Sequence, residues 1–217
     1  MIDRGTANHM DHGEKFNALT HLVGAVLALA GSVALIVLAA LNGDPWKVVS
    51  VSIYGVTLVL LYSFSALYHS LRGHTKAILR KLDHLSIYLL IAGSYTPFCL
   101  VTLRGPWGWS LLGVVWGLAV LGCLHELRPQ SGARILSVVL YVVMGWVVLV
   151  ALVPLLHALG PAGFAWLAAG GLFYTVGIAF YALGSRLAHS HGIWHLFVIA
   201  GSAAHYFAIL RYVLGGA

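Results

Sequence analysis

The feature that most constrains this chain is a series of apolar runs, each long enough to cross a lipid bilayer. A transmembrane α-helix needs about 17–25 predominantly apolar residues. Such runs lie at residues 18–41, 48–70, 83–103, 107–125, 133–156, 163–184 and 192–214. Because 60% of the 217 residues are hydrophobic and only 8% are charged, one soluble core could not hide the apolar surface. The sequence therefore predicts an all-α, polytopic membrane protein with seven transmembrane helices.

The segments between the runs are short and contain turn-forming residues. Breaks rich in Gly, Pro, Asn and Asp occur at 42–45, 104–106, 128–132 and 160–161. We expect a cytoplasmic N-terminal segment at residues 1–17 and one seven-helix transmembrane domain at 18–217. The N-terminal segment lacks the apolar stretch and cleavage site of a signal peptide, so the first run is expected to stay as a membrane anchor.

The distribution of basic residues predicts the orientation, because cytoplasmic loops carry an excess of Lys and Arg. With a cytoplasmic N-terminus, nine of the 12 basic residues face the cytoplasm. These are Arg4, Lys15, Arg72, Lys76, Arg80, Lys81, Arg128, Arg134 and Arg186. We therefore expect a multi-pass protein of the inner (cytoplasmic) membrane whose C-terminus lies outside. No segment is basic enough for a nucleic-acid surface. Membrane lipid is the expected partner, and a homo-oligomer is left open.

Under this topology, polar residues of four runs share one depth near the cytoplasmic leaflet. Ser65 and His69 end the second run, Asp83 begins the third, and His191 and His195 begin the last. At the start of the first run, Glu14, Asn17 and His21 have the i, i+3, i+7 spacing of one helix face, and Thr20 lies beside them. Chance would scatter such residues over both leaflets. The pattern predicts a polar site in this layer.

The histidines of this layer suit a transition metal. His191 and His195 are i, i+4 neighbours on one helix face, a spacing that lets two imidazoles reach one ion. With His69 they form the three-imidazole ligand set of a catalytic zinc site whose fourth position is open. Asp83 could hold or deprotonate a water at that position, and Ser65 could hydrogen-bond the water or a developing oxyanion. We expect zinc as the cofactor, His69, His191 and His195 as its ligands, and Asp83 and Ser65 as catalytic residues.

Plainer interpretations exist for each of these residues taken singly. Asp83 could cap the N-terminus of the third helix, where a carboxylate offsets the helix dipole. His69 could be a histidine at headgroup level, and Ser65 could be a small packing residue bonded to its own helix.

Plainer interpretations also exist for the remaining polar residues of this layer and for two further histidines. The polar face of the first run could be an interfacial cap, which is the favoured interpretation for Thr20. His84 points about 100° away from Asp83, and His205 lies about 15 Å beyond His195, so neither is expected to bind the same ion.

Four motifs resemble those of the hemolysin III family, the bacterial branch of the progestin and adipoQ receptor superfamily and a distant relative of alkaline ceramidases. They are Glu14-x2-Asn17-x2-Thr20-His21, Ser65-x3-His69, Asp83-x2-Ser86-Ile87 and His191-x2-Trp194-His195. The resemblance covers nearly the whole chain. Gly192 stands where relatives carry an acidic residue, at a position that is not a ligand.

This resemblance implies seven helices with a cytoplasmic N-terminus. It also implies zinc held by His69, His191 and His195, with Asp83 contacting the zinc through water and Ser65 nearby. It further implies lipid amide hydrolysis, which is known for the ceramidase-like relatives. The family name records instead a cytolytic, pore-forming activity.

The leading hypothesis is a zinc-dependent hydrolase of a lipid amide or ester, with Asp83 as general base and then acid and Ser65 supporting the oxyanion. The first alternative is a non-enzymatic, receptor-like or membrane-homeostasis protein with structural zinc. The second is a channel-forming cytolysin, which the confinement of polar residues to one side of the membrane argues against. A zinc transporter would need ligands on the outer side, where only His205 is available.

Overall fold

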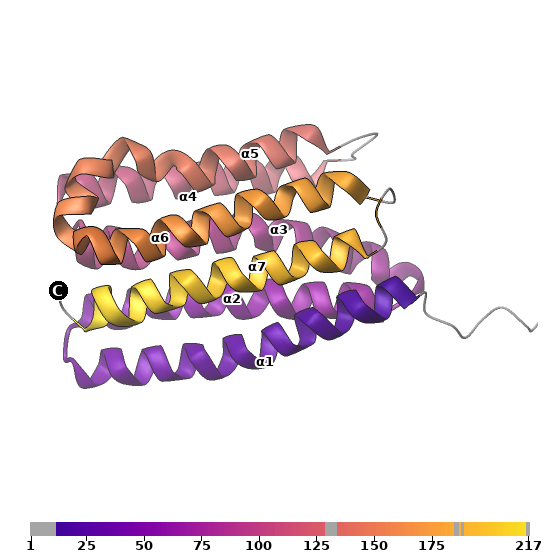
Figure 1. Cartoon of the computed structure of the whole chain (residues 1–217), viewed down its shortest axis with the longest axis horizontal. Helices are drawn as coiled ribbons and strands as arrows, with labels where there is room; N and C mark the ends of the chain where they lie inside the picture. The colour runs from indigo at the N-terminus through magenta and orange to yellow at the C-terminus, as the bar shows by residue number, and fades with distance from the viewer. Residues whose placement is uncertain (1–11, 129–133, 185–186, 188, 216–217) are drawn as a thin grey trace, which may run out of the picture.

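The computed structural model describes residues 12–128, 134–184, 187 and 189–215, and these residues form helices and short connections without any strand. The helices run along one common axis (Figure 1). Their bounds are α1 His12–Leu41, α2 Pro45–Ser70, α3 Gly73–Pro97, α4 Pro106–Leu127, α5 Ile135–Trp146, α6 Leu152–Leu183 and α7 Ser190–Ala208. The all-α prediction is confirmed.

Six helical runs within the described residues are long and apolar enough to cross a membrane. They are Gly13–Leu41, Pro45–Ser70, Gly73–Thr102, Pro106–Leu127, Ile135–Leu183 and Ser190–Leu214. Large apolar side chains such as Leu22, Val26 and Leu121 are exposed on their outer faces, as expected for surfaces that contact lipid.

The run Ile135–Leu183 contains two of the expected spans. A continuous helix of 49 residues would be about 74 Å long, roughly twice a bilayer. The ribbon instead reverses its direction between α5 and the later part of α6 (Figure 1). Gly160 interrupts the helix with φ 68° and ψ 171°, a conformation that favours glycine, and Pro161 follows it. The expected count of seven spans and the cytoplasmic N-terminus stay predictions.

Two helices begin earlier than their apolar runs. α1 begins at His12 and not at residue 18, so Glu14 and Asn17 lie on the helix. α3 begins at Gly73, ten residues before Asp83. The first turns of α3 are polar and basic, and a search for membrane-length apolar runs cannot detect them. Asp83 therefore lies well inside α3, and its interpretation as an N-terminal cap is wrong.

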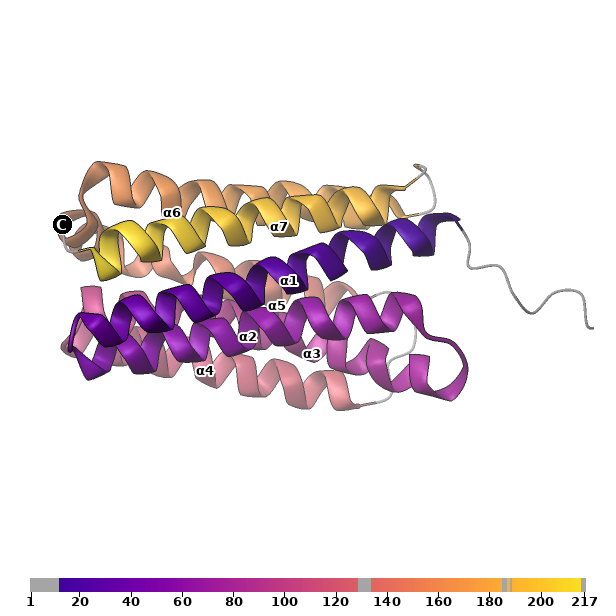
Figure 2. The same cartoon turned by 90° about the horizontal axis from the view of Figure 1, so that it is seen from below.

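Tyrosine side chains connect α7 to its neighbours through Ser202. The Tyr62 hydroxyl of α2 donates to Ser202 Oγ at 2.8 Å, and the Tyr54 hydroxyl donates to the Ser202 carbonyl at 3.3 Å. The Tyr174 hydroxyl of α6 lies 2.8 Å from the same Oγ. α1 packs against α2 and α7, and α6 packs against α7 (Figure 2). The N-terminal ends of α1, α3 and α7 and the C-terminal end of α2 therefore meet at one end of the bundle, the right-hand end in both views.

Candidate metal centre

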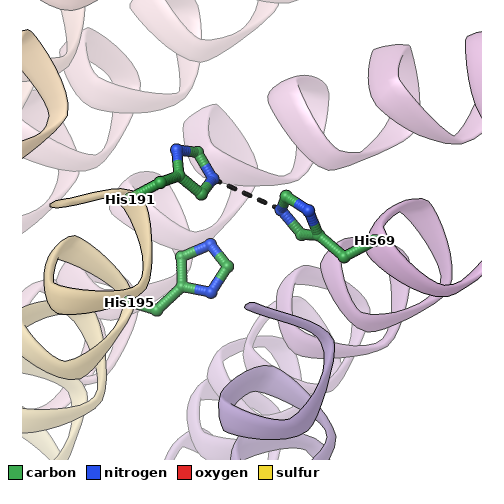
Figure 3. Close-up of side chains that lie close together, drawn as sticks. All are labelled: His69, His191 and His195. Carbon is green, nitrogen blue, oxygen red and sulfur yellow. Dashed lines mark hydrogen bonds between the residues drawn. The ribbon is translucent and has the colours of Figure 1, made fainter. Parts of the chain in front are cut away.

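Three histidines from two helices point toward one another at this end of the bundle (Figure 3). His69 lies in the last turn of α2, while His191 and His195 lie in the first turns of α7. Their candidate ligand atoms all lie within 4.8 Å of one another. His69 and His195 are buried, and His191 is half-buried. The structure thus brings together the three residues expected to be ligands, and this group could hold a metal ion.

The spacing of the ring nitrogens fits a tetrahedral ion. His69 Nε2 and His191 Nε2 are 3.3 Å apart. Two imidazole nitrogens at about 2.0–2.1 Å from one tetrahedral zinc would be about 3.3–3.4 Å apart. The ligand atoms of the group are at most 4.8 Å apart, so the farthest pair would have to approach by at most about 1.5 Å to reach this spacing.

Glu14 of α1 orients His69. Its Oε2 lies 2.7 Å from His69 Nδ1, and its Oε1 accepts from Lys76 Nζ at 3.2 Å. A carboxylate accepts hydrogen bonds, so the His69 proton sits on Nδ1 and the lone pair of Nε2 faces the other two histidines. Carboxylates commonly support metal-binding histidines in this manner.

Asn17 and Thr20 orient His195. His195 Nδ1 lies 3.2 Å from the Asn17 carbonyl oxygen and 3.2 Å from Thr20 Oγ1. The carbonyl can only accept, so the proton sits on Nδ1 and Nε2 carries the lone pair. Among the described residues, Nε2 of His195 is buried and has no hydrogen-bond partner. A buried acceptor nitrogen that has no hydrogen-bond partner and lies beside two other imidazoles is suited to bind a metal ion. Thr20 is buried and contacts His195, so its interpretation as an interfacial cap is wrong.

The close approach of α1 to α7 depends on Gly192. A Cβ atom at this position would lie 2.2 Å from Phe16 Cδ1 and 2.9 Å from Asn17 Oδ1. One turn further along α1, the His21 ring stacks on the His195 ring, with centroids 3.5 Å apart and planes inclined by 13°. The glycine that replaces an acidic residue of the family motif therefore lets α1 reach the histidines.

Asp83 and Ser65 form a buried pair beside the histidines. Asp83 is 6% exposed and Ser65 is 1% exposed, and their side chains interact between α3 and α2. Ser65 therefore interacts with a neighbouring helix and not only with its own. Asp83 does not belong to the group whose ligand atoms converge. The structure brings these two residues to the site, and their catalytic roles stay predictions.

The other histidines near the site do not join the group. His84 faces a different neighbour, with Nδ1 3.3 Å from Glu126 Oε1, and it also contacts Arg134. His205 Nε2 donates to the Leu167 carbonyl at 3.2 Å, at a position about 15 Å along α7 from His195. Their expected exclusion from the ligand set agrees with these positions.

An apolar cavity leads from the site into the bundle. Its volume is about 120 Å³, and its lining passes from Asp83 and His21 along Leu90 and Ile91 to Tyr95 and His205. Asp83 and Tyr95 are 12 residues apart on α3, which corresponds to about 18 Å along the helix. A second cavity of about 320 Å³ lies on the other side of Asp83 and also contacts His191. Asp83 therefore borders both an apolar tunnel and a vestibule whose lining includes several polar side chains.

Sequence reasoning did not predict the contacts that α1 makes with the histidines. The i, i+3, i+7 spacing of Glu14, Asn17 and His21 indicated one polar face, but it did not indicate which helix that face contacts. It also did not predict the buried contact of Glu126 with Arg134 and Ser137. The available signal was an acidic residue at the end of an otherwise apolar run.

Comparison with known proteins agrees with this architecture. Residues 10–206 match the family described as Haemolysin-III related. Hemolysin-3 of Bacillus cereus is 46% identical over 200 residues, which cover 91% of this chain and 90% of that protein. The Hemolysin-3 homolog of Bacillus subtilis (strain 168) is 44% identical over 197 residues, covering 90% and 92% of the two chains.

A more distant relative extends the similarity to animals. The monocyte to macrophage differentiation factor of Homo sapiens is 28% identical over 203 residues, which cover 91% of this chain and 83% of that protein. This likeness fits the progestin and adipoQ receptor superfamily expected from the motifs. With its match over 197 residues and two bacterial relatives above 40% identity, this multi-pass membrane protein belongs to the haemolysin-III-related family.

Proposed function

We propose that the protein is a zinc-dependent hydrolase that cleaves the amide or ester bond of a membrane lipid. The observation that carries this proposal is that Asp83, with Ser65 beside it, lines an apolar cavity near three converging histidines. Three imidazoles with an open fourth position are typical of catalytic zinc sites, whereas structural sites are usually closed by four protein ligands. The apolar cavity suits an acyl chain.

Zinc is the metal that best suits this donor set. His69, His191 and His195 would hold it through neutral ring nitrogens. In His69 and His195, the hydrogen bonds to Glu14 and Asn17 place the proton on Nδ1 and leave the lone pair of Nε2 available to the metal. When bound, zinc supplies a Lewis acid for a carbonyl oxygen and lowers the pKa of water toward about 7.

The chain's own residues would carry the protons. Asp83 would take a proton from the attacking water as the new C–O bond forms at the carbonyl carbon. It would then give that proton to the leaving amine or alcohol as the C–N or C–O bond breaks. Ser65 interacts with Asp83 and would hold the carboxylate in place or support the oxyanion. The products are a fatty acid and an amine or alcohol, so atoms and charge balance.

The proposed setting is the inner membrane, with the N-terminus and the metal centre toward the cytoplasm. The excess of basic residues at the site's end of the bundle supports this orientation. The lipid would then enter from the cytoplasmic leaflet.

The test is hydrolysis of acyl-amide and acyl-ester lipids by detergent-purified, zinc-loaded protein. Asp83→Asn should retain the metal and lose at least about 100-fold in rate, because a general acid–base residue contributes on that order. Ser70→Ala is a matched control for Ser65→Ala, since the Ser70 hydroxyl donates to the Ala66 carbonyl of its own helix. No hydrolysis of any acyl-amide or acyl-ester lipid by the zinc-loaded protein would refute the proposal.

A second candidate is a receptor-like or membrane-homeostasis protein in which zinc is structural. One observation favours it: a bound ion would tie α2 to α7, and Glu14 and Asn17 would connect both to α1. It predicts that His69→Ala lowers thermal stability while Asp83→Asn has no cellular phenotype. The hydrolase proposal predicts a phenotype for both.

A further inference from the structure

The vestibule extends from Asp83 toward the nearer end of the bundle, and it has more charged side chains in its lining than the apolar tunnel. It has a volume of about 320 Å³, and its lining includes Arg80, Arg134, Tyr68 and Tyr181 together with Asp83 and His191 of the site. Two arginines thus face the space through which a lipid headgroup would have to reach the histidines.

Along the vestibule, one face of α3 changes from charged to apolar residues. Arg80, Asp83 and Ile87 have the i, i+3, i+7 spacing of a single helix face, and all three line the vestibule. Arg80 lies about 4.5 Å from Asp83 along the axis, toward the end of the bundle, and Ile87 lies about 6 Å beyond Asp83 in the opposite direction. A charged group bound at Arg80 would therefore leave the adjacent part of the same molecule beside Asp83.

Arg134 is held against the vestibule by a buried acid. Its guanidinium contacts the Glu126 carboxylate and His84, and Glu126 is only 4% exposed. Ser137 Oγ donates to the same carboxylate at 3.3 Å. These contacts hold the Arg134 side chain in place beside the vestibule.

The charges at the vestibule favour an anion at its outer end. Glu126 balances Arg134, but no acidic side chain of the described residues pairs with Arg80. Among the described residues of the lining, Asp83 is the only acid, and it lies at the inner end and interacts with Ser65. Arginine presents several donors in a fixed planar fork that matches the oxygens of a phosphate.

We propose that Arg80 and Arg134 form an anion-binding subsite that holds the phosphate of a phospholipid headgroup at the mouth of the metal centre. The subsite rests on the proposed function, since it would present the acyl linkage of a bound phospholipid to the histidines. Free phosphate could bind the same two arginines, and competition between phosphate and lipid distinguishes the two ligands.

The test measures binding and not turnover. Detergent-purified, zinc-loaded protein is titrated with phosphatidylglycerol and with diacylglycerol of the same acyl chains, and complexes are counted by native mass spectrometry. Wild type should bind phosphatidylglycerol about tenfold more tightly than diacylglycerol, since one charge-assisted hydrogen bond is worth about that factor. Arg80→Gln should remove this preference, and Arg80→Lys should retain part of it.

Lys81→Gln is the matched control, because it removes the same charge from the next, exposed residue, which does not line the vestibule. Arg134 is tested as Arg134→Gln/Glu126→Gln, which avoids leaving the buried carboxylate unpaired, and this pair should also reduce the preference. Inorganic phosphate is added as a competitor. Displacement of phosphatidylglycerol only at phosphate concentrations far above that of the lipid identifies the lipid as the ligand, whereas equally tight binding of phosphate identifies the free anion.

Equal binding of the two lipids by wild type would overturn the proposal, and so would an equal loss in Arg80→Gln and Lys81→Gln. The outcome is separate from that of the hydrolase assay. Arginine-dependent binding without hydrolysis would leave the subsite and refute the enzyme, whereas hydrolysis without a phosphate preference would leave the enzyme and refute the subsite.

Discussion

Replacing Glu14 tests whether α1 prepares the histidines for a metal. The Glu14 carboxylate lies 2.7 Å from His69 Nδ1, the distance of a charge-assisted hydrogen bond. Such a bond orients the ring and raises the basicity of Nε2, and its loss typically costs about 10–100-fold in metal affinity. The Glu14 side chain is 32% exposed, so solvent weakens its field and the lower end of that range applies. We expect Glu14→Ala to weaken zinc binding about tenfold, or about 1.4 kcal/mol.

The assay is competition for zinc against a chelating indicator, with helix content followed by circular dichroism. Glu14→Gln keeps an oxygen acceptor without the charge, so it should show a smaller loss than Glu14→Ala. Lys76→Gln is the matched control, because Lys76 bonds the other carboxylate oxygen and its loss leaves both partners of the Glu14–His69 hydrogen bond in place. Unchanged affinity in a folded Glu14→Ala protein, or an equal loss in Lys76→Gln, would refute the reasoning.

Two further substitutions test the surroundings of the site. Gly192→Ala should lower the melting temperature and the metal affinity together, because its Cβ would lie 2.2 Å from Phe16 and would push α1 away from His195; Gly13→Ala, which meets nothing within 4 Å, is the control, and equal melting curves would contradict the account. Gly145→Leu should slow lipid hydrolysis without changing metal content, because Gly145 lines the apolar cavity and a Cβ there meets nothing within 4 Å. Gly117→Leu, which has the same free space but does not line this cavity, should have no such effect, and equal rates in the two variants would exclude the cavity as the acyl site.

The apolar runs predicted the helices well because a bilayer imposes both their length and their composition. They predicted the start of α3 poorly, since the residues from Gly73 to Asp83 are helical but polar. That error allowed Asp83 to be interpreted as a helix cap, whereas the structure places it about three turns inside the helix and beside Ser65.

The three histidines were found because residues at one depth on neighbouring helices can meet, and depth follows from position in an apolar run. Their hydrogen-bond partners were not found, because the periodicity of α1 gives a face without its neighbour. Which helix contacts Glu14 depends on tertiary packing, including the close approach that Gly192 allows. The Glu126–Arg134 contact was missed for the same reason, since it joins α4 to the residue that precedes α5.

The most direct test of the central claim is the metal content of the detergent-purified protein. It should be measured for wild type, for His191→Ala/His195→Ala, for Asp83→Ala and for His189→Ala, a nearby histidine outside the converging group. We expect about one zinc per chain in wild type, in Asp83→Ala and in His189→Ala, and none in the double histidine variant. A wild-type protein that retains no stoichiometric metal, even after zinc is supplied, would contradict the account.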